Sequence, residues 1–228
     1  MVCVRSARPR LLVLGLDGLP LSLAGRLSAQ LPGLADLLAL AGPAGTVRAE
    51  LPELSPVNWT SFYTASGPER HGVFGFTRLD PRDYRMRLVD ATVPVGPTIF
   101  DRLGAAGLVS KVLNLPNTYP ARPLRGMLVA GFVAPDLARA VYPPFLLGPL
   151  TAAGYRVEAD TRRAAEDPEP LLAELAATLD GRARALDLLW PDLAWDLFTF
   201  VLTETDRLFH FLFPAVVTPE HRLHNACM

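Results

Sequence analysis

Two short apolar runs, one near each end of the chain, most constrain its fold. Leu11 to Leu16 reads LLVLGL and is followed at once by Asp17, while Leu197 to Leu202 reads LFTFVL and precedes Asp206. Continuously apolar runs of about six residues are typical of parallel strands that are buried on both faces. The carboxyl ends of parallel strands share one edge of their sheet, where ligands gather. We therefore expect the two aspartates to lie close together.

Between these runs, strand and helix patterns alternate along the chain. Leucine spacing and capping residues predict one or two helices over 21–40 and single helices over 56–64, 98–106, 143–150, 171–189 and 206–213. Apolar or alternating stretches predict strands over 109–113 and 127–132, and short strands over 46–51 and 155–157. Such alternation favours a layered α/β/α sandwich with a mainly parallel central sheet. We predict a single α/β domain over 1–228, with a surface insert around 77–97 and a candidate cap over 133–170.

Composition excludes several classes of protein. Half of the residues are hydrophobic and a fifth are charged, which fits a globular domain and not a disordered chain. The formal net charge of −1 gives no electrostatic reason to expect a nucleic-acid or membrane partner. No stretch reaches the roughly 20 apolar residues of a membrane-spanning helix, and the first apolar run is too short for a secretion signal. Cys3 and Cys227 are too far apart in sequence for a zinc knuckle. We expect a soluble, cytoplasmic protein.

A serine stands where a helix should begin. Ser55 precedes Pro56, and proline is favoured in the first turn of a helix. Helix starts offer free backbone N–H groups and a partial positive charge, an environment that binds phosphate-like anions. Ser55 is thus a candidate nucleophile, and Asn58 one turn later could donate its amide to a phosphoryl oxygen. The alternative is that Ser55 is a plain N-cap residue and Asn58 a solvated helix residue. Thr60 and Ser61 are rival hydroxyls inside the same helix.

Candidate metal ligands lie at both ends of the chain. Asp206 and His210 are four residues apart on a predicted helix, so they share one face, and carboxylate plus imidazole suits a first-row divalent metal. An ordinary Asp–His surface contact is the alternative. Asp17 could be a ligand as well, or could serve the Asp-Gly turn that it begins. His71, in a His-Gly pair, more often supports a loop than binds metal.

In this order, these pieces resemble the alkaline phosphatase superfamily, and within it the type I phosphodiesterase/nucleotide pyrophosphatase branch. The resemblance runs from about residue 10 to the end of the chain. The matching stretches are 15–18 (GLDG), 55–64 (SPVNWTSFYT), 68–76 (PERHGVFGF), 114–120 (NLPNTYP), 126–132 (GMLVAGF) and 205–210 (TDRLFH).

The resemblance implies hydrolysis of a phosphodiester or nucleotide pyrophosphate bond in a small phosphorylated substrate. Two divalent ions are implied, Zn²⁺ in the first place and Mn²⁺ as the alternative. Asp17 and the nucleophile Ser55 would contact one ion, and Asp206 and His210 would hold the other. The serine would form a covalent phosphoserine intermediate, while Asn58 would help to hold the non-bridging oxygens.

The chain departs from the family pattern in three places. Serine replaces the frequent threonine at position 55, and Thr64-Ala65 replaces the usual Thr-Gly. The later Ser-Asp-His-Gly segment and a final histidine, which supply the remaining ligands in the family, do not occur. We therefore expect a chain that is incomplete at its C-terminus, with an incomplete ligand set. The alternative function is a non-catalytic family member that binds an anion or another protein.

Overall fold

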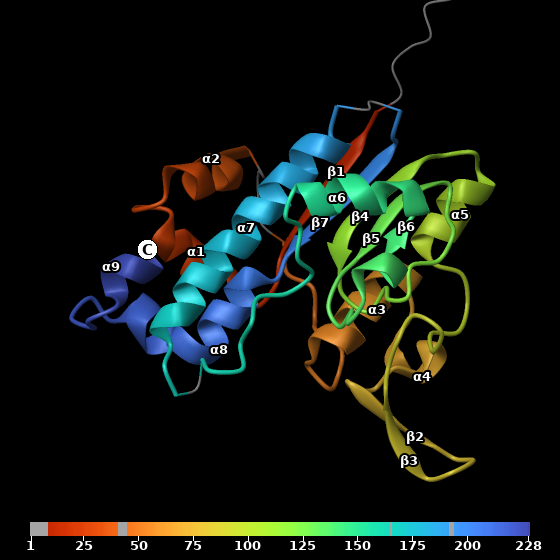
Figure 1. The fold of residues 1–228 in the computed structure, drawn as a ribbon, viewed down its shortest axis with the longest axis horizontal. Coiled ribbons are helices and arrows are strands. Elements are labelled where there is room, and N and C mark those ends of the chain that lie inside the picture. Colours follow the sequence, from red (N-terminus) through yellow and green to blue (C-terminus); the bar gives the residue numbers. More distant parts are fainter. Residues whose placement is uncertain (1–8, 41–44, 165, 192–193) are drawn as a thin grey trace, which may run out of the picture.

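A five-stranded sheet forms the centre of the computed structural model, which describes residues 9–40, 45–164, 166–191 and 194–228 (Figure 1). Cys3 lies outside these residues. The strand order is β1-β7-β4-β5-β6, and all neighbours pair in parallel except β5 and β6. The bounds are β1 (Leu11–Leu16), β4 (Ser110–Leu115), β5 (Gly126–Ala130), β6 (Val141–Tyr142) and β7 (Leu197–Leu202). The prediction of an α/β fold with a mainly parallel sheet is confirmed.

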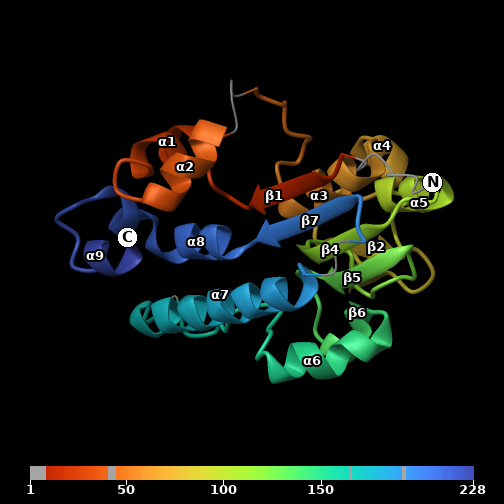
Figure 2. The ribbon, with the colours of Figure 1, turned by 90° about the horizontal axis from the view of Figure 1, so that it is seen from above.

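Helices cover both faces of this sheet (Figure 2). On one face, α6 (Leu147–Ala152) and α7 (Glu169–Leu189) pack their apolar side chains against Phe198 and its neighbours in β7. On the other face, α3 (Ser55–Thr64) and α5 (Ile99–Ala105) contribute Tyr63 and Phe100 to a second buried cluster. The start of α5 has a complete capping box between Thr98 and Asp101. Both faces are therefore occupied, as parallel sheets require.

The remaining elements lie around this core. An antiparallel hairpin, β2 with β3, projects from the body of the molecule (Figure 1), and ion pairs from Asp80 to Arg82 in its turn and to Arg87 in its second strand hold it together. The other elements are α1 (Leu21–Leu27), α2 (Pro32–Leu40), α4 (Pro68–His71), β2 (Thr77–Asp80), β3 (Arg85–Leu88), the 3₁₀ turns η1 (Leu137–Arg139) and η2 (Pro144–Leu146), α8 (Glu204–Val217) and α9 (His224–Cys227). None of the helices in the described ranges combines the length and hydropathy needed to cross a lipid bilayer.

The strand β1 has the predicted bounds and direction, but it is not buried. It lies at the edge of the sheet, and Leu11 and Leu12 are 59% and 49% exposed. The expectation of a strand buried on both faces was therefore wrong. The apolar run specifies a strand that could be covered on both faces, whereas its exposure depends on which segments lie beside it.

Three further local predictions differ from the structure. Residues 46–51 and 155–157 are not strands: Val47 is 96% exposed, and no strand of the described chain pairs with either segment. The helix predicted from Asp206 begins two residues earlier and extends to Val217 as α8. It is kinked at Leu212, where φ is −129°, because Pro214 cannot donate to the preceding turn.

Candidate active site

The carboxyl ends of β1 and β7 bring Asp17 and the turn before Asp206 together. The backbone N–H of Asp17 donates to Leu202 O at 2.9 Å, which continues the ladder one residue beyond the strands. The hydroxyl of Thr205 then donates to Asp17 O at 2.6 Å. Segments from opposite ends of the sequence are thus tied to each other at one edge of the sheet.

Gly18 makes this close approach feasible. Its φ of +71° lies in the left-handed region that favours glycine, and a Cβ there would lie 2.9 Å from Asp206 Cα and 3.0 Å from Asp206 Oδ1. The Asp-Gly pair is therefore both a turn and a point where the backbone passes against Asp206. The two interpretations of Asp17, turn residue and site residue, are compatible.

Ser55 lies against the carboxylate of Asp17. Its hydroxyl donates to Asp17 Oδ2 at 3.1 Å, with Oδ1 at 3.4 Å. Ser55 is the first residue of α3, and Leu54, in an extended conformation, is the N-cap, so the prediction that Ser55 caps the helix was wrong. A serine inside the first turn has its hydroxyl free to bond Asp17. The hydroxyl of an N-cap serine would instead accept a hydrogen bond from the helix backbone.

The helix start offers fewer free amides than an average helix. Pro56 has no N–H, and the N–H groups of Val57 and Asn58 both donate to Leu54 O at 3.0 Å. In the described part of the chain, the backbone N–H of Ser55 is left as the donor without a partner at this helix start. An anion at Ser55 would meet one free amide and the positive end of the helix.

Trp59 is the site residue that sequence reasoning missed. Its indole N–H donates to Asp17 Oδ1 at 3.0 Å, and its ring lies so close to Gly15 that a Cβ there would be 2.6 Å from Trp59 Cη2. Two signals could have identified it. Trp59 stands one helical turn after Ser55 and so shares its face, and Gly15 interrupts an otherwise aliphatic strand, which indicates a close neighbour.

Asn58 lies beside the site, but its side chain is already engaged. Its amide oxygen accepts from the backbone N–H of Glu50 at 2.9 Å, and its NH₂ group makes long contacts of 3.4 Å and 3.3 Å with the carbonyls of Glu50 and Leu54. In this conformation Asn58 pins the segment before α3 to the helix. Donation to a ligand would require the NH₂ group to leave one of these carbonyls.

Asp206 and His210 lie on one face of α8, as predicted, and make the Asp–His contact that was the alternative to metal binding. Their Oδ1 and Nε2 atoms are 3.4 Å apart, and the imidazole is 64% exposed. Arg207 also approaches Asp206, with 3.7 Å between the guanidinium and Oδ2. Within the described ranges, no group of three or more histidines, cysteines, aspartates or glutamates is placed to hold a metal ion. The two halves of the predicted metal site are near each other without forming a closed ligand cage.

The charge of Asp17 is unfavourable in this setting. Burial raises its pKa above the ordinary value of 3.8, the nearby carboxylate of Asp206 raises it further, and the hydrogen bond from Trp59 opposes both effects. Because the folded protein holds this proton more tightly than the unfolded chain, the free energy of unfolding should fall as the pH rises from 3.8 through the raised pKa.

We therefore expect Asp17→Asn to stabilise the metal-free protein near neutral pH. Asparagine keeps an oxygen that can accept from Trp59 and removes the partly buried negative charge next to Asp206. Urea denaturation in EDTA across the acidic to neutral range should give a flatter pH dependence and a higher stability than for the wild type. The control is Asp36→Asn, at an exposed position in α2, which should change neither the pH dependence nor the free energy of unfolding. A variant less stable than wild type at neutral pH would contradict this account.

A comparison with family models decides which family these residues belong to. The model described as Type I phosphodiesterase / nucleotide pyrophosphatase matches residues 11–224. The chain belongs to this family. None of the curated proteins compared with the chain matches it.

Solved structures agree with the type I phosphodiesterase/nucleotide pyrophosphatase assignment at the level of the fold. Phosphonoacetate hydrolase from Sinorhizobium meliloti 1021, in complex with phosphonoformate, is 18% identical and superposes with a TM-score of 0.52. The same enzyme in complex with phosphonoacetate is 18% identical and gives a TM-score of 0.53. Each match covers 90% of this chain and 51% of the other, so the chain spans about half the length of these structures. The expected membership of the type I phosphodiesterase/nucleotide pyrophosphatase family and the expected α/β fold are confirmed.

The rival hydroxyls of this family member are occupied elsewhere. Thr60 is fully buried and donates to Pro56 O at 2.6 Å. Ser61 Oγ lies 2.9 Å from Nε2 of His71, whose Nδ1 accepts from the N–H of Val73 at 3.1 Å. That second bond places the imidazole proton on Nε2, so His71 donates to Ser61 and does not act as its base. His71 supports a loop, as its sequence context indicated.

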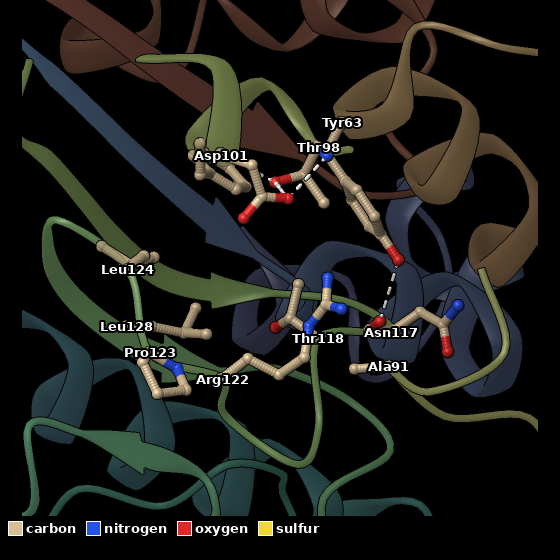
Figure 3. Close-up of a pocket in the computed structure, with 11 residues that line it drawn as sticks. Tyr63, Ala91, Thr98, Asp101, Asn117, Thr118, Arg122, Pro123, Leu124 and Leu128 are labelled. Carbon is tan, nitrogen blue, oxygen red and sulfur yellow. Dashed lines mark hydrogen bonds between the residues drawn. The ribbon is translucent and has the colours of Figure 1, made fainter. Parts of the chain in front are cut away.

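Two cavities flank α3, and only one contains the candidate residues. An open cavity of about 740 Å³ is lined by Asp17, Ser55, Asn58, Trp59 and Asp206, among others. A second, smaller and mostly apolar pocket lies at the other end of the helix, where the Tyr63 hydroxyl donates to Asn117 O at 3.0 Å (Figure 3). None of the predicted nucleophile and metal residues lines it. The chemistry of the site therefore points to the open cavity.

Proposed function

We propose that this chain carries the nucleophile half of a metal-dependent phosphohydrolase site, acting on a phosphodiester or nucleotide pyrophosphate bond of a small substrate. The observation that carries the proposal is the contact of the Ser55 hydroxyl with the partly buried Asp17 carboxylate, with Asp206 packed against Gly18. Hydroxyl, carboxylates and imidazole from Ser55, Asp17, Asp206 and His210 are oxygen and nitrogen donors that suit Zn²⁺ or Mn²⁺.

The donor set fits a divalent cation in charge and falls short in number. Burial in the first place, and the charge of Asp206 in addition, raise the pKa of Asp17, and a cation between the two carboxylates would neutralise both. When bound, such an ion would stabilise the charge that develops on the phosphoryl oxygens. Fewer than three acidic or histidine side chains of the described chain converge on any one point, so the affinity for metal should be weak.

In the proposed reaction, Ser55 attacks phosphorus in line with the leaving group. A bond forms from Oγ to phosphorus while the bond to the leaving oxygen breaks, and the hydroxyl proton moves along the existing hydrogen bond to Asp17. The free N–H of Ser55 and the start of α3 stabilise a non-bridging oxygen. Asn58 could add its amide after releasing a backbone carbonyl. Water then attacks phosphorus, the bond from Oγ to phosphorus breaks, and the proton held by Asp17 returns to Ser55.

Trapping the intermediate tests this proposal. The protein is mixed with bis(4-nitrophenyl) phosphate and Mn²⁺ or Zn²⁺, quenched in acid and digested, and the peptide that contains Ser55 is analysed by mass spectrometry. We expect nitrophenol release that stops with EDTA and a phosphoryl adduct on Ser55. An adduct on another residue, or turnover that EDTA leaves unchanged, would contradict the proposal.

The second candidate is a non-catalytic module that binds an anion or a protein. The lack of a three-ligand cluster among the described residues favours it. It predicts weak binding of at most one metal ion and no nitrophenol release. Nitrophenol release with added Mn²⁺ separates the two candidates, because turnover that depends on the metal excludes the non-catalytic module.

A further inference from the structure

A buried ion pair lies directly behind the turn that carries Asp206. Arg182 in α7 is fully buried, and its Nε donates to Oε1 of Glu204 at 2.5 Å. Glu204 is 5% exposed and is the first residue of α8. Charged side chains are seldom buried to this degree unless they are paired, and removing one partner then leaves an uncompensated buried charge.

The guanidinium of Arg182 joins three parts of the chain. Besides Glu204 it donates to Val157 O at 2.8 Å, to the Tyr155 hydroxyl at 3.3 Å and to Thr203 Oγ1 at 3.3 Å. Gly181 allows this approach, because a Cβ there would lie 2.7 Å from Gly154 O. One side chain thus ties α7 and the 154–157 segment to the turn after β7.

The turn between β7 and α8 lacks the side-chain capping hydrogen bond that usually fixes the start of a helix. Thr203 is the N-cap of α8, yet its side chain makes no capping hydrogen bond. Its hydroxyl oxygen instead accepts hydrogen bonds from the Arg182 guanidinium and, at 3.4 Å, from the side-chain NH₂ group of Asn114. Side chains of α7 and β4, on the side of the turn away from the cavity, therefore hold residues 203–206 in their conformation.

Three successive residues of this turn link Arg182 to the candidate site. Glu204 bonds Arg182, Thr205 donates to Asp17 O, and Asp206 packs on Gly18. Resting on the proposed function, we propose that Arg182 and Glu204 are positioning residues, which hold Asp206 and Asp17 at the spacing that a shared divalent cation and Ser55 require. Neither residue touches the cavity of the site. Residues that orient metal ligands typically change metal affinity by about 10–100-fold when they are replaced.

The test replaces Glu204 and measures Asp17 in two independent ways. In Glu204→Ala, calorimetric titration with Mn²⁺ should show affinity reduced by about tenfold or more. The indole N–H resonance of Trp59, which reports its hydrogen bond to Asp17, should shift in metal-free protein. Of the three tryptophan signals, that of Trp59 is assigned with Trp59→Phe. Glu204→Gln keeps the size of the side chain and should give smaller changes of the same sign.

Leu175→Ala is the control, since Leu175 is a buried residue of α7, the helix that carries Arg182, and packs in an apolar cluster that contains neither Arg182 nor Glu204. It should lose stability and leave both readouts unchanged. Unchanged Mn²⁺ affinity and an unchanged Trp59 resonance in the Glu204 variants would overturn the inference. If wild-type protein binds no Mn²⁺, the proposed function fails, while the Trp59 resonance still decides whether the ion pair positions Asp17.

Discussion

The Ser55→Ala variant is expected to lose hydrolysis of a phosphodiester by about 10⁴-fold or more in kcat. Alanine removes the only hydroxyl that contacts the Asp17 carboxylate among the described residues. No neighbouring hydroxyl can replace it, because Thr60 and Ser61 are engaged with Pro56 and His71. Nitrophenol release with added Mn²⁺ measures the loss.

Ser61→Ala is the control for this prediction. It removes a hydroxyl from the same helix and leaves Nε2 of the buried His71 without its partner. Stability should fall by about 1–3 kcal/mol, while turnover per folded molecule stays the same. Normal turnover by Ser55→Ala, or loss of turnover only in Ser61→Ala, would overturn the assignment of the nucleophile.

Gly18→Ala is expected to damage both stability and the site. The left-handed backbone at φ +71° costs a residue with a side chain about 1–2 kcal/mol. The added Cβ must also displace Asp206, whose Cα would lie 2.9 Å away. We expect a clear drop in the free energy of unfolding in urea, together with weaker Mn²⁺ binding in calorimetry.

Gly25→Ala separates this effect from glycine replacement in general. Gly25 lies inside α1, with nothing within 4 Å of the position where a Cβ would be. Alanine there should raise stability by up to about 1 kcal/mol, because it favours the helix. Equal behaviour of the two variants would show that the backbone at Gly18 does not hold Asp206 in place.

The sequence allowed the strands of the site to be located to the residue. The runs ending before Asp17 and Thr203 match β1 and β7, because a continuous apolar stretch bounded by polar residues leaves little freedom in the limits of a strand. The contact of Ser55 with Asp17 could be anticipated only from the family resemblance. Neither residue carries local information about the other, since their proximity depends on the packing of α3 against the sheet.

What sequence reasoning missed depends on tertiary contacts. In the sequence, Trp59 looks like an ordinary apolar helix residue. In the fold, the missing side chain of Gly15 leaves room for its indole, which then reaches Asp17. Arg182 and Glu204 look like solvated charges in an amphipathic pattern, and only the meeting of α7 with the β7 turn buries them. The 46–51 segment alternates like a strand, but it has no partner strand in the described chain.

The edge position of β1 has a consequence for handling the polypeptide. Leu11 and Asp17 direct their N–H groups to β7, so strand geometry turns those of Leu12, Leu14 and Leu16 outward. This row contains no charge, proline or bulge of the kind that keeps edge strands from adding further strands. Folded molecules are therefore expected to associate by pairing their β1 edges. Aggregation of this kind must be controlled by the protein concentration during purification and storage.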